Sequence, residues 1–225
     1  MRTLRVASYN LHKCRGMVGP HAPERNLQVI ADLDAHVIAL QEVDFRFGAR
    51  PEALPRALIR ELTGMEPAPH LTTSEQSLGW HGQTVLIRPE LAAQASVRRL
   101  PLPGIEPRGA LALRLAAPDA RGLTVIVMHL GLARSSRRAQ LARLLKEVRP
   151  GDVVLVTRLD RLARSTRDLL NVLGALAEKG AAFRSLGDPW ADTTSPHGRL
   201  MLTVLAGLAE FERELIRSRT GEGRA

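Results

Sequence analysis

Short apolar runs alternate with amphipathic stretches along most of the chain, and this alternation restricts the fold more than any other feature. Apolar, β-prone runs predict strands at 4–9, 36–40, 83–87, 110–115, 123–128, 153–156 and 182–186. Apolar residues at helical spacing predict helices at 26–33, 55–62, 136–148, 165–179 and 198–219. The pattern indicates an α/β fold. Because the run at 153–156 is continuously apolar, it predicts a buried parallel strand.

The charge balance points to a polyanionic partner. The net charge is +9 and the isoelectric point is about 11.1, which favours DNA, RNA or a phosphate ester as the partner. The excess is almost all arginine, since lysine occurs only at Lys13, Lys146 and Lys179. A GC-rich coding sequence is the alternative explanation for such usage. The charge therefore indicates nucleic acid without establishing it.

Other classes of protein are disfavoured by what the sequence lacks. Cys14 is the only cysteine, so neither an intrachain disulfide nor a cysteine-based zinc site is expected. The first residues lack the apolar core of a secretory signal. No run reaches the roughly 18 apolar residues of a membrane span. We therefore expect a cytoplasmic protein with no membrane partner.

Two polar residues follow neighbouring strands in the first part of the chain. Asn10 ends the segment SYN, and Glu42 follows the segment VIALQ. Their oxygens are ligands of the kind that Mg²⁺ prefers. An ordinary exit from strand to loop, with solvated side chains, remains the alternative.

Residues 1–145 resemble the endonuclease/exonuclease/phosphatase superfamily in four stretches. These are RVASYNLHKCRG, ADLDAHVIALQEVD, LPLPGIEPRGALALRL and LTVIVMHLGL. The resemblance implies a four-layer α/β sandwich and metal-assisted attack of water on a phosphate ester. Glu42 would bind Mg²⁺, Asn10 would support the metal or the phosphate, His129 would face the scissile phosphate, and Arg108 would touch a phosphate. A histidine satisfied by a backbone carbonyl and a surface arginine are the alternatives for the last two.

This first part departs from the superfamily where its catalysis should be completed. The superfamily has a strand that ends in Gly-Asp-Phe-Asn and a later strand that ends in Asp-His. Neither motif occurs in this sequence, and Gly151-Asp152 precedes an apolar run instead of following one. The carboxylate that activates water and the histidine that stabilises the transition state are therefore missing in motif form.

Residues 146–225 resemble the resolvase/invertase group of serine recombinases. The most distinctive segments are LDRLARS at 159–165 and AEFER at 209–213. Arg161 and Arg164 lie three residues apart, so they can share one face and clamp a phosphate. In the family such arginines surround the scissile phosphate. Pairing with Asp160 or Asp168 is the structural alternative.

The resemblance also assigns roles to the last predicted helix. In the family this helix dimerises and its end crosses the DNA minor groove. That implies a homodimer through 198–219 and DNA contacts by Arg213, Arg217 and Arg219, unless these arginines form only a solvated basic helix end. The family nucleophile is a serine in an Arg-Val-Ser context. No such context occurs in this sequence, and no cofactor is implied for this part.

The two resemblances meet in one predicted helix. RRAQLARLLKE at 137–147 fits either family, so a fusion there need not break local structure. We expect an incomplete four-layer α/β sandwich over 1–145, joined to a partial resolvase-like parallel-sheet domain with a long C-terminal helix over 146–225. The expected function is DNA binding by a recombinase-like segment fused to a truncated, magnesium-dependent nuclease-like segment, with catalysis incomplete. A metal-dependent hydrolase and a non-functional fusion product are the alternatives.

Overall fold

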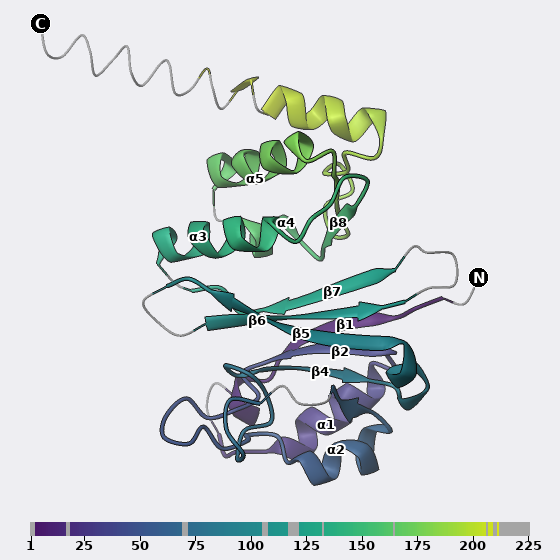
Figure 1. The fold of residues 1–225 in the computed structure, drawn as a ribbon, viewed down its shortest axis with the longest axis vertical. Helices are drawn as coiled ribbons and strands as arrows, with labels where there is room; N and C mark the ends of the chain where they lie inside the picture. Colours follow the sequence, from purple (N-terminus) through teal and green to yellow (C-terminus); the bar gives the residue numbers. More distant parts are fainter. Residues whose placement is uncertain are drawn as a thin grey trace, which may run out of the picture. The chain divides into compact units, whose positions relative to one another are not determined.

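The chain forms two compact units, Met1–Gln140 and Leu141–Ala225. A computed structural model describes residues 3–16, 19–68, 72–104, 108–116, 122–131, 133–163, 165–205, 207–208 and 211, without the side chain of Arg134. Both units mix helices with strands, which confirms the predicted α/β class (Figure 1). The join expected near residue 145 stays a prediction.

The first unit contains a mixed sheet with helices on one face. The strands lie in the order β1 (Val6–Asn10), β2 (Val37–Gln41), β4 (Gln83–Ile87) and β3 (Glu66–Pro67). β1 and β2 are parallel, whereas β2 and β4 are antiparallel. Helices α1 (Pro23–Asp32) and α2 (Arg56–Thr63) cover one face (Figure 1). Leu27 and Ile59 from these helices pack with Ile38 and Leu40 of β2 in one fully buried cluster.

A second sheet covers the other face of the first. It is antiparallel, in the order β5 (Ala95–Leu102), β6 (Arg108–Leu115) and β7 (Leu123–Met128). Val37 and Val85 of the first sheet share a buried cluster with Leu111 and Val127 of the second. The unit is thus layered as helices, sheet and sheet (Figure 1). Two 3₁₀ turns, η1 (His12–Cys14) and η2 (Pro89–Gln94), complete its short elements.

β5 was not predicted, and its sequence explains why. It contains Arg98, Arg99 and Pro101, which do not read as an apolar strand. Among the described strands β5 pairs only with β6. An edge strand tolerates a proline because one row of its backbone N–H groups needs no partner strand. The apolar pattern therefore revealed β6 and β7 and missed β5, one edge of this sheet.

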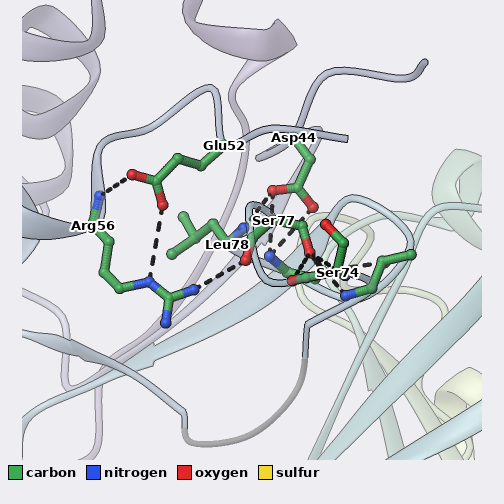
Figure 2. Close-up of polar contacts among 8 residues, drawn as sticks. Asp44, Glu52, Arg56, Ser74, Ser77 and Leu78 are labelled. Atoms are coloured by element: carbon green, nitrogen blue, oxygen red, sulfur yellow. Dashed lines mark hydrogen bonds and ion pairs between the residues drawn. The ribbon is translucent and has the colours of Figure 1, made fainter. Parts of the chain in front are cut away.

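A polar network around the buried Asp44 holds the loop that precedes β4 (Figure 2). Asp44 is only 2% exposed, and its Oδ1 accepts hydrogen bonds from the N–H of Leu78 at 2.7 Å and of Gly79 at 3.3 Å. Arg56 donates to the carbonyl of Ser77 at 3.0 Å and lies 3.9 Å from Glu52. The loop is thereby fixed to the strand-end segment of β2 and to the start of α2.

Helix α3 (Arg134–Leu145) contains the residues at which the two units join in the sequence. Gln140 is 1% exposed. Its side chain accepts a hydrogen bond from the N–H of Gly131 at 2.9 Å and donates one to the carbonyl of Pro103 at 3.1 Å. The first part of α3 is therefore anchored within the first unit by a buried amide.

The second unit is built on one parallel strand pair, β8 (Val153–Val156) and β9 (Ala182–Ser185). Helix α4 (Leu159–Leu162) follows β8, and α5 (Thr166–Glu178) follows with Ser165 as its N-cap. α5 buries Leu169, Val172, Leu173 and Leu176 on one face. Gly180 has φ of +68°, which suits a glycine directly after a helix C-terminus.

One expectation for the second unit is wrong. β8 is not a buried strand, since Val153 is 48% and Leu155 52% exposed. The helix that begins at residue 196 buries Leu202, at 7%, and leaves Leu208 54% and Phe211 60% exposed. Leu215, farther along the helix predicted at 198–219, lies outside the described residues.

Among the described residues, no helix is both long enough and apolar enough to cross a membrane.

Candidate functional site

Asn10 and Glu42 come together at one edge of the first sheet. Asn10 is the last residue of β1, and Glu42 directly follows β2, so the parallel pairing brings both to the same edge. The amide Nδ2 of Asn10 donates a hydrogen bond to Oε1 of Glu42 over 3.0 Å. The two residues that the sequence singled out as oxygen donors therefore touch.

His129 and Arg108 join this pair from the second sheet. His129 directly follows β7, and its Nδ1 lies 4.0 Å from Oε1 of Glu42. Arg108, the first residue of β6, donates to the backbone carbonyl of His129 over 3.5 Å. All four residues predicted for the first part thus lie in one cluster, which we call the Glu42 cluster: Asn10, Glu42, Arg108 and His129, with Lys13. Their chemical roles stay predictions.

Lys13 is the member that the sequence analysis missed. Its Nζ forms an ion pair with Oε2 of Glu42 at 2.8 Å. The neighbouring His12 donates its N–H to Oδ1 of Asn10 at 3.0 Å. One signal was available, because Lys13 is one of only three lysines in a chain with 32 basic Lys and Arg residues.

The charges of this cluster act on two pKa values. Burial alone would raise the pKa of Glu42, but hydrogen bonds from Lys13 and Asn10, with the charge of Lys13, outweigh it and lower that pKa. Burial lowers the pKa of His129, and the charge of Arg108 lowers it further against the opposing effect of Glu42. Glu42 is therefore ionised and His129 neutral at pH 7, which suits a site whose positive charge resides on Lys13 and Arg108.

The arrangement does not fit Mg²⁺ as it stands. Both carboxylate oxygens of Glu42 accept hydrogen bonds from nitrogen, at 2.8 and 3.0 Å. Among the residues that the structure describes, no group of three or more His, Cys, Asp or Glu could hold a metal ion. Mg²⁺ requires near-octahedral oxygen ligands. A divalent ion at Glu42 would meet a carboxylate that is already paired with the ammonium group of Lys13.

Of the arginines predicted to contact phosphate or DNA in the second unit, the structure describes one, Arg161. Arg161, in α4, has a side chain that is 71% exposed and lies 3.7 Å from Asp160. Arg158 pairs more closely with the same carboxylate, at 3.1 Å, with its side chain 64% exposed. The pairing with Asp160, raised as the structural alternative, is thus present. Arg164, Arg213, Arg217 and Arg219 lie outside the described residues.

A groove of about 570 Å³ lies within the second unit. α4, α5, the 196–205 helix and Trp190 provide its walls. The lining residues are Leu159, Asp160, Ala163, Ser165, Thr166, Leu169, Trp190, Met201 and Leu205. Ser165 does not act as a free hydroxyl there, because its Oγ accepts the N–H of Asp168 at 3.2 Å as a helix cap.

Curated relatives match the second half of the chain. A protein named "Resolvase" from Clostridium perfringens (strain 13 / Type A) is 47% identical over 89 residues, which cover 39% of this chain and 47% of the relative. A "DNA-invertase" from Escherichia phage P1 is 38% identical over 112 residues, covering 50% of this chain and 60% of the relative. The chain thus spans about half the length of the relatives it matches.

A solved structure and a family model complete the comparison. The structure of an endonuclease/exonuclease/phosphatase from Beutenbergia cavernae DSM 12333 is similar over 64% of this chain and 44% of that chain, with 19% identity and a TM-score of 0.44. The family model "Resolvase, N terminal domain" matches residues 112–225. This match spans half of the 225 residues and includes β8, α4, α5 and β9. The chain therefore belongs to the resolvase N-terminal domain family.

Proposed function

We propose that this chain binds the phosphate backbone of DNA through its second unit. One observation carries the proposal: Arg158 and Arg161 stand exposed in the segment that directly follows β8, with 64% and 71% of their side chains accessible. Guanidinium groups match the geometry of phosphate oxygens. The name of one relative, a DNA-invertase, supports DNA as the polyanion.

The ion pairs of these arginines do not prevent such binding. Asp160 lies 3.1 Å from Arg158 and 3.7 Å from Arg161, and its own side chain is 50% exposed. Exposed pairs of this kind contribute between about 0 and 1 kcal/mol. A DNA phosphate can therefore replace Asp160 as the partner of either arginine. The net charge of +9 supplies a favourable long-range field.

A salt titration tests the proposal on the full chain. We expect a labelled duplex of arbitrary sequence to bind at 50 mM salt and to be released by 200 mM, since each phosphate contact adds about −0.9 to the slope of log affinity against log salt. Arg161→Gln should weaken binding and reduce this slope by about one contact. Arg149→Gln is the matched control, because Arg149 precedes β8 and lies at the opposite end of the strand pair.

Two outcomes would contradict backbone binding at this segment. The first is a clear preference for one sequence over scrambled duplexes of equal length. The second is an Arg149→Gln protein that loses as much affinity as the Arg161→Gln protein. The latter result would assign the effect to net charge alone.

We further propose that the chain is a fusion whose recombinase part does not cut DNA. The Arg-Val-Ser context of the family nucleophile does not occur in the sequence. Ser165 serves as a helix cap. Incubation with supercoiled plasmid, followed by denaturing capture of protein-linked DNA, should yield no adduct. A reproducible phosphoserine adduct would overturn this proposal.

The helix that begins at residue 196 supports a homodimer. Leu200, Val204, Leu208 and Phe211 recur at helical spacing and are 54–61% exposed. Full burial of such a side chain contributes about 1.5–3 kcal/mol, and these side chains have a little over half of their surface left to bury. A second copy of the same helix would cover this stripe. Sedimentation equilibrium across micromolar concentrations should therefore give a mass above that of the 24.6 kDa monomer.

Phosphate-ester hydrolysis by the first unit is the second candidate function. The convergence of Asn10, Glu42 and His129 from three separate strands favours it. Release of nitrophenol from an activated phosphodiester, with and without Mg²⁺, tests it directly. Turnover that disappears in both Glu42→Gln and His129→Ala would support this candidate, and equal turnover in all three proteins would reject it.

A further inference from the structure

Lys13 is held against Glu42 by its main chain as well as by its side chain. The N–H of Lys13 donates to the carbonyl of Glu42 over 3.1 Å, and Leu11 donates to Gln41 over 2.9 Å. These bonds continue the parallel pairing of β1 and β2 beyond the strand ends. The ammonium group then reaches Oε2 of Glu42 at 2.8 Å. The position of Lys13 is therefore set by the backbone.

The turn that carries Lys13 has an unusual conformation. His12, Lys13 and Cys14 have φ angles of 49°, 56° and 56°, and Glu42, across the turn, has φ of 56°. Non-glycine residues rarely adopt this left-handed region, and they keep it where surrounding contacts hold them there. Cys14 supplies such a contact, because it is 0% exposed in the core of the first unit.

The same turn already occupies one acceptor position on each oxygen that a metal would use. Oε2 of Glu42 accepts from Lys13, and Oε1 accepts from Asn10. Oδ1 of Asn10 accepts from the N–H of His12. A divalent ion would compete with a unit positive charge already 2.8 Å from its carboxylate ligand.

We propose that the ammonium group of Lys13 is the resident cation of Glu42, and that a divalent ion binds the Glu42 cluster only by displacing it. The carboxylate of Glu42 is then neutralised without a metal ion. This inference concerns the first unit and is independent of DNA binding by the second. It assigns Lys13 a positioning and charge-balancing role at Glu42.

Titration of the full chain with Mn²⁺ tests the proposal, with the concentration of free ion measured by electron paramagnetic resonance. Lys13→Met removes the charge and keeps a side chain of similar length. We expect it to bind Mn²⁺ about tenfold more tightly than the unchanged protein, because a unit charge next to the ligand is gone. Lys13→Arg is the matched control, since it keeps the charge and should bind no more Mn²⁺ than the unchanged protein.

A reversal experiment shows whether the gained ion sits at Glu42. Adding Glu42→Gln to Lys13→Met should abolish the gain. Lys13→Gln serves as a second neutral variant should Lys13→Met fail to give the cooperative thermal transition of the unchanged protein. The proposal is overturned if the neutral variants bind Mn²⁺ no better than the unchanged protein, or if Lys13→Arg gains as much as they do.

Discussion

Two apolar runs of almost the same composition have opposite surroundings in the two units. The β2 residues Val37, Ile38 and Leu40 are 0% exposed, whereas Val153 and Leu155 of β8 are 48% and 52% exposed. β2 lies between β1 and β4 and is covered on both faces, by helices and by the second sheet. Among the described strands, β8 pairs only with β9. A strand's burial is therefore set by its neighbours, which its own sequence does not encode.

The largest expected effect comes from truncating the buried run. Leu40→Ala should lower the free energy of unfolding of the first unit by about 2–5 kcal/mol, because it leaves a cavity in a closed core. Leu155→Ala should lower that of the second unit by less than about 1 kcal/mol, because half of the side chain is already in water. Urea denaturation measures both. Equal losses of unfolding free energy would show that β8 is covered in solution, and that β2 and β8 do not differ in burial there.

The chain offers a separate fluorescent reporter for each unit. Trp80 lies in the first unit and Trp190 in the second, and these are its two tryptophans. Trp190→Phe leaves a signal from the first unit, and Trp80→Phe leaves one from the second. Since Trp80 is itself 9% exposed and buried, the Leu40→Ala measurement belongs in the Trp190→Phe background.

The sequence predicted the positions of the strands better than their burial and contacts. The runs at 83–87, 123–128 and 153–156 have the strand boundaries that the structure shows. Local periodicity is sufficient for this, because it depends on each segment alone. The edge strand β5 was missed because its arginines and proline break the pattern. Lys13 was missed because its role depends on a backbone turn and on Glu42, 29 residues away.

A buried carboxylate in the first unit should make its stability depend on pH. Burial raises the pKa of Asp44 from 3.8 to about 6, against hydrogen bonds from Leu78 and Gly79. The folded state then binds this proton more tightly than the unfolded state. The stabilisation is full below about pH 4 and is lost as the pH rises through 6.

The comparison of unchanged protein with Asp44→Asn isolates this effect. The difference in their free energies of unfolding should change by about 2–3 kcal/mol between pH 4 and pH 7. The free energy of unfolding of the unchanged protein should fall relative to that of Asp44→Asn as the pH rises. Urea denaturation at several pH values, followed through Trp80, gives the difference directly. A difference that does not vary with pH would show that Asp44 does not titrate in this range.

The exposed stripe of the second unit should govern self-association. Val204→Asp together with Leu208→Asp places two charges on side chains that are 57% and 54% exposed. We expect the dimer dissociation constant to rise at least about tenfold, or 1.4 kcal/mol, measured by sedimentation. Thr203→Asp, at an exposed polar position beside Val204, is the matched control. An unchanged mass for the double variant would exclude this stripe as the interface.

The smallest expected effect concerns the exposed carboxylate that faces the proposed DNA contact. Asp160 contrasts with Asp44 because its side chain is 50% exposed, and it lies 3.1 Å from Arg158 and 3.7 Å from Arg161. Asp160→Asn removes a negative charge that repels phosphate and competes for both arginines. We expect DNA affinity at low salt to rise about two- to fivefold, since exposed pairs are worth at most about 1 kcal/mol. Glu178→Gln makes the same change in net charge at the end of α5, before β9. Fluorescence anisotropy on one duplex compares the two variants.

A similar gain for Glu178→Gln would mean that net charge alone sets the affinity. A loss for Asp160→Asn would mean that Asp160 holds the arginines in their binding position.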